Sequence, residues 1–162
     1  MLFISLNNNA FKNYVQNYVQ NMFKEYVTYL YRIIMKSGSK TSIFKEYCHY
    51  LNIYKEKYGK KTVVLMQVGS FYEIYAILND EEELGETDIH NLCNNIMNIS
   101  VANKSNQVLM AGFQVPYADK FLKLLIHEGY RVVLVEQVSE GSGAERAVKE
   151  IISPGTFMKY TD

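Results

Sequence analysis

The sequence predicts an α/β protein in which a mixed β-sheet is flanked by helices, with an added amphipathic helix at the N-terminus. Continuous apolar runs, such as residues 62–68 and 132–137, are typical of strands covered on both faces. Other segments carry apolar residues at helical spacing. The two kinds of segment alternate along the chain, as they do in layered α/β folds.

The first 40 residues are predicted to be separate from the rest. Residues 10–35 carry a wide apolar stripe with helical periodicity, and Ser37-Gly38-Ser39 is typical of a linker. The stripe could pack on the downstream domain, on a partner helix or on a second copy of itself. Alternatively, Met35 is the true start and the segment has no selected role. The predicted organisation is thus a helix and linker over residues 1–40 and a domain over residues 41–160.

Within the domain, the predicted elements follow in order. A helix starts after Thr41 or Ser42 and ends near Gly59, and extended segments over 62–68 and 71–78 are separated by a bend at Gly69. The acidic stretch 79–86 is predicted to be a solvated loop, and a helix carries the stripe from Ile89 to Met97. The remaining elements are strands 98–101 and 108–113, a helix from Pro116 to Gly129, a strand over 132–137, a turn over 139–143 and a strand over 147–153.

Formal charge is balanced over the 162 residues but unevenly distributed. Residues 1–61 carry ten Lys or Arg against three Glu, and residues 62–103 carry only acids. Zero net charge argues against strong, sequence-independent duplex binding, which depends on many Lys or Arg contacts to phosphates. The group Lys55, Lys57, Lys60 and Lys61 either touches phosphates or simply lies at a helix C-terminus, where cations are favourable.

Cysteine usage and hydropathy favour a soluble, intracellular protein whose compartment is unknown. Cys48 and Cys93 are far apart and outside any Cys-x-x-Cys motif, which suits a reduced setting. With His49 and His90 they form a nominal zinc set, but adjacent residues on a helix diverge by about 100°, so we expect no metal. The sequence contains neither a signal-peptide apolar region nor an uninterrupted apolar span, so no membrane association is expected.

The most informative stretch is Phe71-Tyr72-Glu73. Side chains alternate on an extended backbone, so Phe71 and Glu73 should share one face while Tyr72 and Ile74 point into the body. An exposed aromatic ring can slide between unstacked bases, and a neighbouring carboxylate can accept a hydrogen bond from a base N–H. Taken alone, the tripeptide is a weak signal, and the more common structure for it is a strand end that exposes one aromatic residue and one solvated acid.

The sequence context favours the first interpretation. The motif is followed by Met110-Ala111-Gly112-Phe113, Pro116-Tyr117, a helical pattern ending near Gly129-Tyr130, the run from Val132 to Gln137, and Ile151-Ile152-Ser153-Pro154-Gly155-Thr156. This order of blocks, over about residues 43–158, resembles the N-terminal mismatch-recognition domain (domain I) of the MutS family of DNA mismatch repair proteins. It departs from the family at Ser70, where an acid is common, in one extra residue before Pro116, and in the acidic insert near residues 80–88.

The resemblance implies a mismatched-DNA binding module in which Phe71 inserts at a mispair and Glu73 hydrogen-bonds the base. Gly69, Ser70 and Lys104 are further expected DNA-binding positions. The expected partners are mismatched double-stranded DNA and either the remaining MutS domains on another chain or further copies of this chain in a homo-oligomer.

The family's enzymatic activity is not expected in this chain. No Gly-x-x-x-x-Gly-Lys-Ser/Thr motif occurs in the 162 residues, so the ATP, Mg²⁺ and clamp function of full MutS belong to domains not represented in them. We therefore expect no catalytic residues and no cofactor. Two alternatives remain: a protein-interaction module that uses the N-terminal helix, or a non-functional fragment that no longer recognises DNA.

Overall fold

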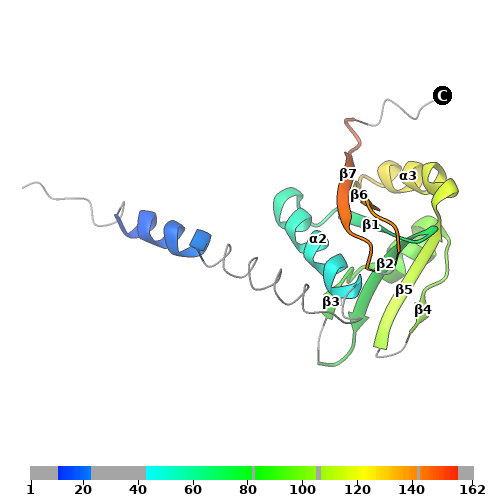
Figure 1. Cartoon of the computed structure of the whole chain (residues 1–162), viewed down its shortest axis with the longest axis horizontal. Helices are drawn as coiled ribbons and strands as arrows, with labels where there is room; N and C mark the ends of the chain where they lie inside the picture. Colours follow the sequence, from blue (N-terminus) through cyan, green and yellow to red (C-terminus); the bar gives the residue numbers. More distant parts are fainter. Residues whose placement is uncertain (1–10, 23–42, 82, 105–106, 142, 157–162) are drawn as a thin grey trace, which may run out of the picture. The chain divides into compact units, whose positions relative to one another are not determined.

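A computed structural model of the chain describes residues 11–22, 43–81, 83–104, 107–141 and 143–156 (Figure 1). Contacts divide the chain into two units, residues 1–42 and 43–162. In the first unit, residues 11–22 form a helix, as predicted; the rest of the predicted 10–35 helix and the 37–39 linker lie outside the described residues. The expected domain bounds of 1–40 and 41–160 remain a prediction. No helix within the described ranges is long and apolar enough to cross a membrane.

The second unit contains one mixed sheet and its covering helices. Its elements are α2 (Ile43–Tyr58), β1 (Thr62–Val68), β2 (Phe71–Leu78), β3 (Glu83–Gly85), the π-helix η1 (Asn91–Met97), β4 (Ala102–Asn103), β5 (Val108–Gln114), the 3₁₀ turn η3 (Val115–Tyr117), α3 (Ala118–His127), β6 (Arg131–Gln137) and β7 (Arg146–Ile152). The predicted α/β class is confirmed, as is the helix after Pro116, which begins through η3.

The seven-stranded sheet has the order β4-β5-β2-β1-β6-β7, with β3 also paired to β2. β1 and β6 are parallel, with Val63 opposite Val132, and the other pairs are antiparallel. β1 pairs with only the first part of β2, and β3 pairs with the last part. The start of β2 therefore lies next to the carboxyl end of β1.

Helices cover both faces of the sheet (Figure 1). On one face, Tyr47 of α2 packs edge-on against Tyr75 of β2, with ring centroids 5.6 Å apart. On the other face, the ring centroid of Phe113 of β5 lies 4.1 Å from that of Phe121 of α3. Tyr72 is the cross-strand partner of Phe113 and is three residues from Tyr75, so strand alternation places α2 and α3 on opposite faces. Both β1 and β6 are buried between these layers.

The acidic stretch is not the solvated loop that was predicted. Residues 83–85 form β3, and Glu86 is fully buried. Gly85 permits this pairing because a Cβ there would lie 2.4 Å from the Tyr75 carbonyl oxygen. Lys55 Nζ lies 2.8 Å from Glu86 Oε1 and compensates its charge. Burial raises the pKa of Glu86, and the ion pair with Lys55 opposes that shift.

The predicted strand over 98–101 is also wrong, because the strand on this side is β4 at residues 102–103. Asn98 adopts a left-handed conformation with φ 53° and ends η1. The Ile99 N–H donates to the Cys93 carbonyl oxygen at 2.8 Å. These backbone groups cap the helix, so they are not available to a sheet. The apolar stripe of η1 was predicted correctly, since Ile89, Leu92, Cys93 and Met97 are buried.

Candidate nucleic-acid interface

The candidate site is the two-residue turn that joins β1 to β2. Val68 pairs with Phe71, so Gly69 and Ser70 form the connection. Gly69 has φ +61° and Ser70 has no positive φ, the pattern of a type II′ hairpin turn with glycine at its first central position. A residue with a Cβ would be strained at Gly69. The turn therefore ends the β1–β2 hairpin tightly, directly before Phe71.

The side chains of Gln67, on β1, and of Gln137, at the end of β6, hold this turn. The Gly69 N–H donates to Gln137 Oε1 at 2.6 Å, and Gln67 Nε2 donates to the Gly69 carbonyl at 3.0 Å. The Val115 N–H donates to the Ser70 carbonyl at 2.9 Å. Both polar groups of Gly69 and the carbonyl of Ser70 are thus bonded to the rest of the fold, which fixes the backbone that presents Phe71.

Alternation along β2 follows the sequence prediction. Phe71 is 42% exposed, whereas Tyr72 is 2% exposed and Ile74 is buried completely. Glu73 is half-buried and lies on the same face as Phe71, about 7 Å along the strand. The prediction that Phe71 and Glu73 share one outward face is confirmed as geometry.

Glu73 has two neighbours that the sequence did not indicate. The Tyr75 hydroxyl donates a hydrogen bond to Glu73 Oε2. On β5, Gly112 is the cross-strand partner of Glu73, and a Cβ at Gly112 would lie 3.2 Å from Glu73 Cγ. The Glu73 side chain is therefore bonded by a residue of its own strand, and the absence of a side chain at Gly112 leaves room for it on the side of β5. Recognising Tyr75 required only the i, i+2 spacing, but recognising Gly112 required the strand register.

On the opposite face, Tyr72 is anchored through its hydroxyl, which donates to Glu136 Oε1. Lys149 Nζ lies 2.8 Å from the same oxygen. Burial tends to raise the pKa of Glu136, but the hydrogen bonds from Lys149 and Tyr72 outweigh it and the pKa lies below its ordinary value. The buried neighbour of Phe71 is thus tied to β6 and β7, which limits movement of the start of β2.

The structure brings Gly69, Ser70, Phe71 and Glu73 together but places Lys104 elsewhere. The Lys104 N–H donates to the Val108 carbonyl at 2.7 Å, and Val108 pairs with Ile77 at the far end of β2. Six residues of strand separate that end from Phe71, roughly 20 Å. The Gln67 side chain lies beside the site and holds the turn.

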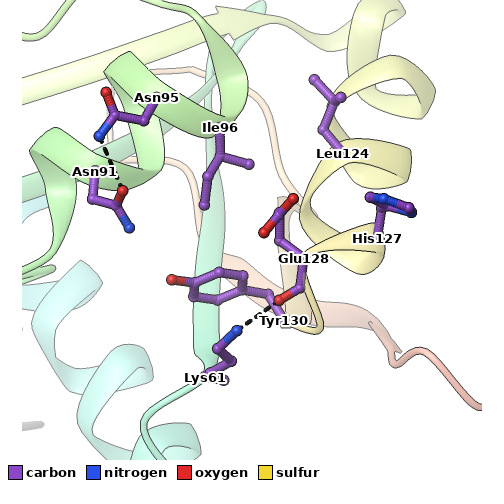
Figure 2. A pocket seen from close by; sticks show the side chains of 8 residues that line it. All are labelled: Lys61, Asn91, Asn95, Ile96, Leu124, His127, Glu128 and Tyr130. Atoms are coloured by element: carbon purple, nitrogen blue, oxygen red, sulfur yellow. Dashed lines mark hydrogen bonds between the residues drawn. The ribbon is translucent and has the colours of Figure 1, made fainter.

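The lysines near residue 60 also lie far from Phe71, at the start of β1. Lys61 Nζ donates to the Glu128 carbonyl at 2.7 Å and lies over the Tyr130 ring. It lines a pocket of about 470 Å³ between η1 and α3, shown in Figure 2. Asn95 and Asn91 line the opposite wall and are hydrogen-bonded to each other at 3.1 Å (Figure 2). Two pairs of residues that line this pocket are bonded to each other, Lys61 to Glu128 and Asn95 to Asn91.

The nominal set of two thiols and two histidines does not gather into a metal site in the part of the chain that the structure describes. Cys48 and Cys93 are free, and burial raises their pKa to about 11 and about 12. Within the described ranges, no three His, Cys, Asp or Glu side chains are close enough together to hold a metal ion.

Comparison with known proteins gives a consistent assignment. The profile of the family described as MutS domain I matches residues 47–161. DNA mismatch repair protein MutS 1 of Halobacterium salinarum is 33% identical over 101 residues, covering 60% of this chain and 10% of that protein. MutS of Thermosipho melanesiensis is 33% identical over 97 residues, covering 57% of this chain and 10% of that protein. MutS of Chlorobium limicola is 29% identical over 100 residues, covering 59% of this chain and 10% of that protein.

The chain thus spans about a tenth of the length of the curated relatives it matches. The matched region contains the whole sheet and the turn before Phe71. The family profile extends over most of the chain, and the chain therefore belongs to the MutS domain I family.

Proposed function

We propose that this chain is a mismatch-recognition module of DNA mismatch repair, in which Phe71 inserts at a mispaired step and Glu73 accepts a hydrogen bond from the displaced base. The observation that carries the proposal is the joint outward projection of Phe71 and Glu73 beside a fixed hairpin turn. Membership of the MutS domain I family supports the same role.

The wedge acts on the deformability of the duplex. Inserting an apolar side chain from the minor groove unstacks a base step at a cost of a few kcal/mol and kinks the DNA. A mispaired step resists this distortion less than a matched one, so the same wedge favours it. Stacking of a base on the Phe71 ring would return about 1–3 kcal/mol. The fixed turn favours binding because Phe71 is already ordered in the free protein, so little conformational entropy is lost when it meets DNA.

Glu73 would supply discrimination more than affinity. A carboxylate near phosphates is repelled, and at an intact pair it finds no free base donor. At a mispair, an exposed base N–H can meet the carboxylate and offset its desolvation. Glu73 would thus weaken binding to matched DNA, whereas at a mismatch the hydrogen bond from the base would offset the repulsion.

The module itself should bind DNA weakly. Its net charge is zero, and the lysines near residue 60 and Lys104 lie at edges remote from Phe71. We propose that most of the grip on the duplex comes from outside this module. It would come from other MutS domains, on the same polypeptide or on another chain, or from a second copy of this chain. The proposed role of these residues is binding alone, and ATP hydrolysis would belong to those other domains.

The test compares a G·T duplex with its A·T control at low salt, where weak binding is strongest. The ratio of the two dissociation constants, matched over mismatched, is the mismatch ratio. Phe71→Ala should lower binding to the G·T duplex roughly fivefold to a hundredfold. Leu84→Ala is the matched control, because Leu84 is 43% exposed on β3, at the other end of β2. A mismatch ratio that is the same for the native protein and for Phe71→Ala would reject the proposal.

A second candidate function, a protein-interaction module, rests on one observation. In the helix over residues 11–22, six apolar side chains are between 41% and 68% exposed: Phe11, Tyr14, Val15, Tyr18, Val19 and Met22. Equal, weak binding of all protein variants to both duplexes would favour this alternative.

A further inference from the structure

We propose that Tyr75 is a positioning residue that sets mismatch selectivity by holding the Glu73 carboxylate in a single orientation. This inference rests on the proposed function and adds to it a residue whose side-chain hydroxyl bonds Glu73. It also implies a division of the carboxylate: Oε2 is bound to Tyr75, and Oε1 is the oxygen that accepts from the base.

The ring of Tyr75 is held by the fold. Tyr75 is almost fully buried, and its ring packs edge-on against Tyr47 of α2 at 5.6 Å. Tyr75 lies two residues after Glu73 on β2, so both side chains are on the same face of the strand, and the Tyr75 hydroxyl donates to Glu73 Oε2. A buried ring with little rotational freedom thus carries a hydroxyl at a constant position beside the carboxylate.

The proton of this hydroxyl stays in place. Burial is the main cause that raises the pKa of Tyr75 far above its ordinary value, and the hydrogen bond to Glu73 raises it further. Tyr75 therefore remains a donor at any pH at which DNA is studied. Oε2 must accept that hydrogen bond, whereas Oε1 accepts none from the residues that the structure describes.

Gly112 leaves room for the Glu73 side chain on the side of β5 because it has no side chain of its own. A Cβ at Gly112 would approach Glu73 Cγ to 3.2 Å, so any larger residue would push Glu73 away from β5. Tyr75 and Gly112 together define where the carboxylate lies: one bonds it and the other leaves it room. A carboxylate fixed in this way loses little side-chain entropy when it meets a base N–H.

The orientation matters because the required ligand is directional. A base N–H must lie near the plane and lone-pair direction of the accepting oxygen. A freely rotating Glu73 would present its charge to matched and mismatched duplexes in many orientations, and phosphate repulsion would then act with little compensation. Fixing the carboxylate concentrates its acceptor capacity at one position, about 7 Å along the strand from the wedge.

The experiment is a double-mutant cycle on the mismatch ratio, carried out with the whole 162-residue chain. Tyr75→Phe removes only the hydroxyl and keeps the packed ring. It should lower the mismatch ratio roughly threefold to tenfold, the net effect of one typical intramolecular hydrogen bond. In a Glu73→Ala background the same change should have no further effect, because its target is absent. Tyr47→Phe is the matched control, since it removes a buried hydroxyl of the same ring pair that does not bond Glu73.

The outcomes separate this inference from the proposed function. If Phe71→Ala lowers the mismatch ratio while Tyr75→Phe keeps the native value, the positioning role is wrong and the proposed function stands. An equal loss for Tyr75→Phe with and without Glu73 would mean that Tyr75 acts through the fold, which also rejects the inference. If the native chain shows no preference for the G·T duplex, both proposals fail. Urea unfolding of each variant identifies changes that arise from lost stability.

Discussion

The close approach of β5 to β2 predicts a cost for the smallest possible side chain at Gly112. A Cβ there would lie 2.8 Å from the Tyr72 carbonyl oxygen and 3.2 Å from Glu73 Cγ. The first contact is with backbone inside a paired strand, which cannot move without disturbing the ladder on both sides. Gly112 has no positive φ, so alanine fits its backbone conformation, and the effect of Gly112→Ala on the folded state is steric.

The size of the effect follows from two opposing contributions. Overpacking in a well-packed region costs about 1–3 kcal/mol. Replacing glycine by alanine also restricts the unfolded chain, which stabilises the folded state by about 0.4–1 kcal/mol. The net expectation is that Gly112→Ala lowers the free energy of unfolding by about 1–2 kcal/mol. It should also displace Glu73 and lower the mismatch ratio.

The control is Gly155→Ala. A Cβ at Gly155 meets no atom within 4 Å, and its φ is not positive, so only the unfolded-state contribution should remain. Stability is measured by urea unfolding, followed by far-UV circular dichroism because the chain has no tryptophan. Equal stability of the Gly112→Ala and Gly155→Ala proteins would refute the argument, since it would mean that β5 does not approach β2 as closely as described.

Three further predictions follow from other parts of the fold. The pKa of Glu86 is higher in the folded protein than in the unfolded chain, where it is near 4.5. As pH rises from 4.5 towards the folded-state pKa, the unfolded chain loses this proton first, so the contribution of Glu86 to the free energy of unfolding falls. The urea midpoint of the Glu86→Gln protein should therefore increase relative to that of the native protein as pH rises through this range. A difference between the two midpoints that does not change with pH would contradict this. Gln137→Ala removes the acceptor of the Gly69 N–H and should speed hydrogen exchange at Gly69 and lower the mismatch ratio; unchanged exchange would show that the bond does not form in solution. Deleting residues 1–42 should leave the unfolding midpoint and the mismatch ratio of the remainder unchanged, because its contacts form a separate unit; loss of the folded signal would assign the N-terminal segment to the core.

The local pattern of the sequence was enough for most elements and for the presentation of Phe71. The apolar run from Thr62 to Val68 predicted a doubly covered strand, and the structure buries its first five residues. The alternation at Phe71, Tyr72 and Glu73 predicted which side chains face outward, because the two-residue period of a strand does not depend on its neighbours. The turn at Gly69 was likewise recognisable, since its requirement for positive φ is a property of the residue itself.

What depends on contacts distant in the chain was decided by tertiary structure. Gln137 bonds Gly69 across 68 residues, and Gly112 faces Glu73 only because of the β2–β5 register. Glu86 looked like a solvated acid in a charged run, but its ion pair with Lys55, which comes from α2, allows it to be buried. Lys104 was an expected DNA-binding position, and the structure places it near the far end of β2, where Val108 pairs with Ile77. A period or a turn is encoded within a few neighbouring residues, whereas register, burial and distance between strand ends depend on how the whole sheet is assembled.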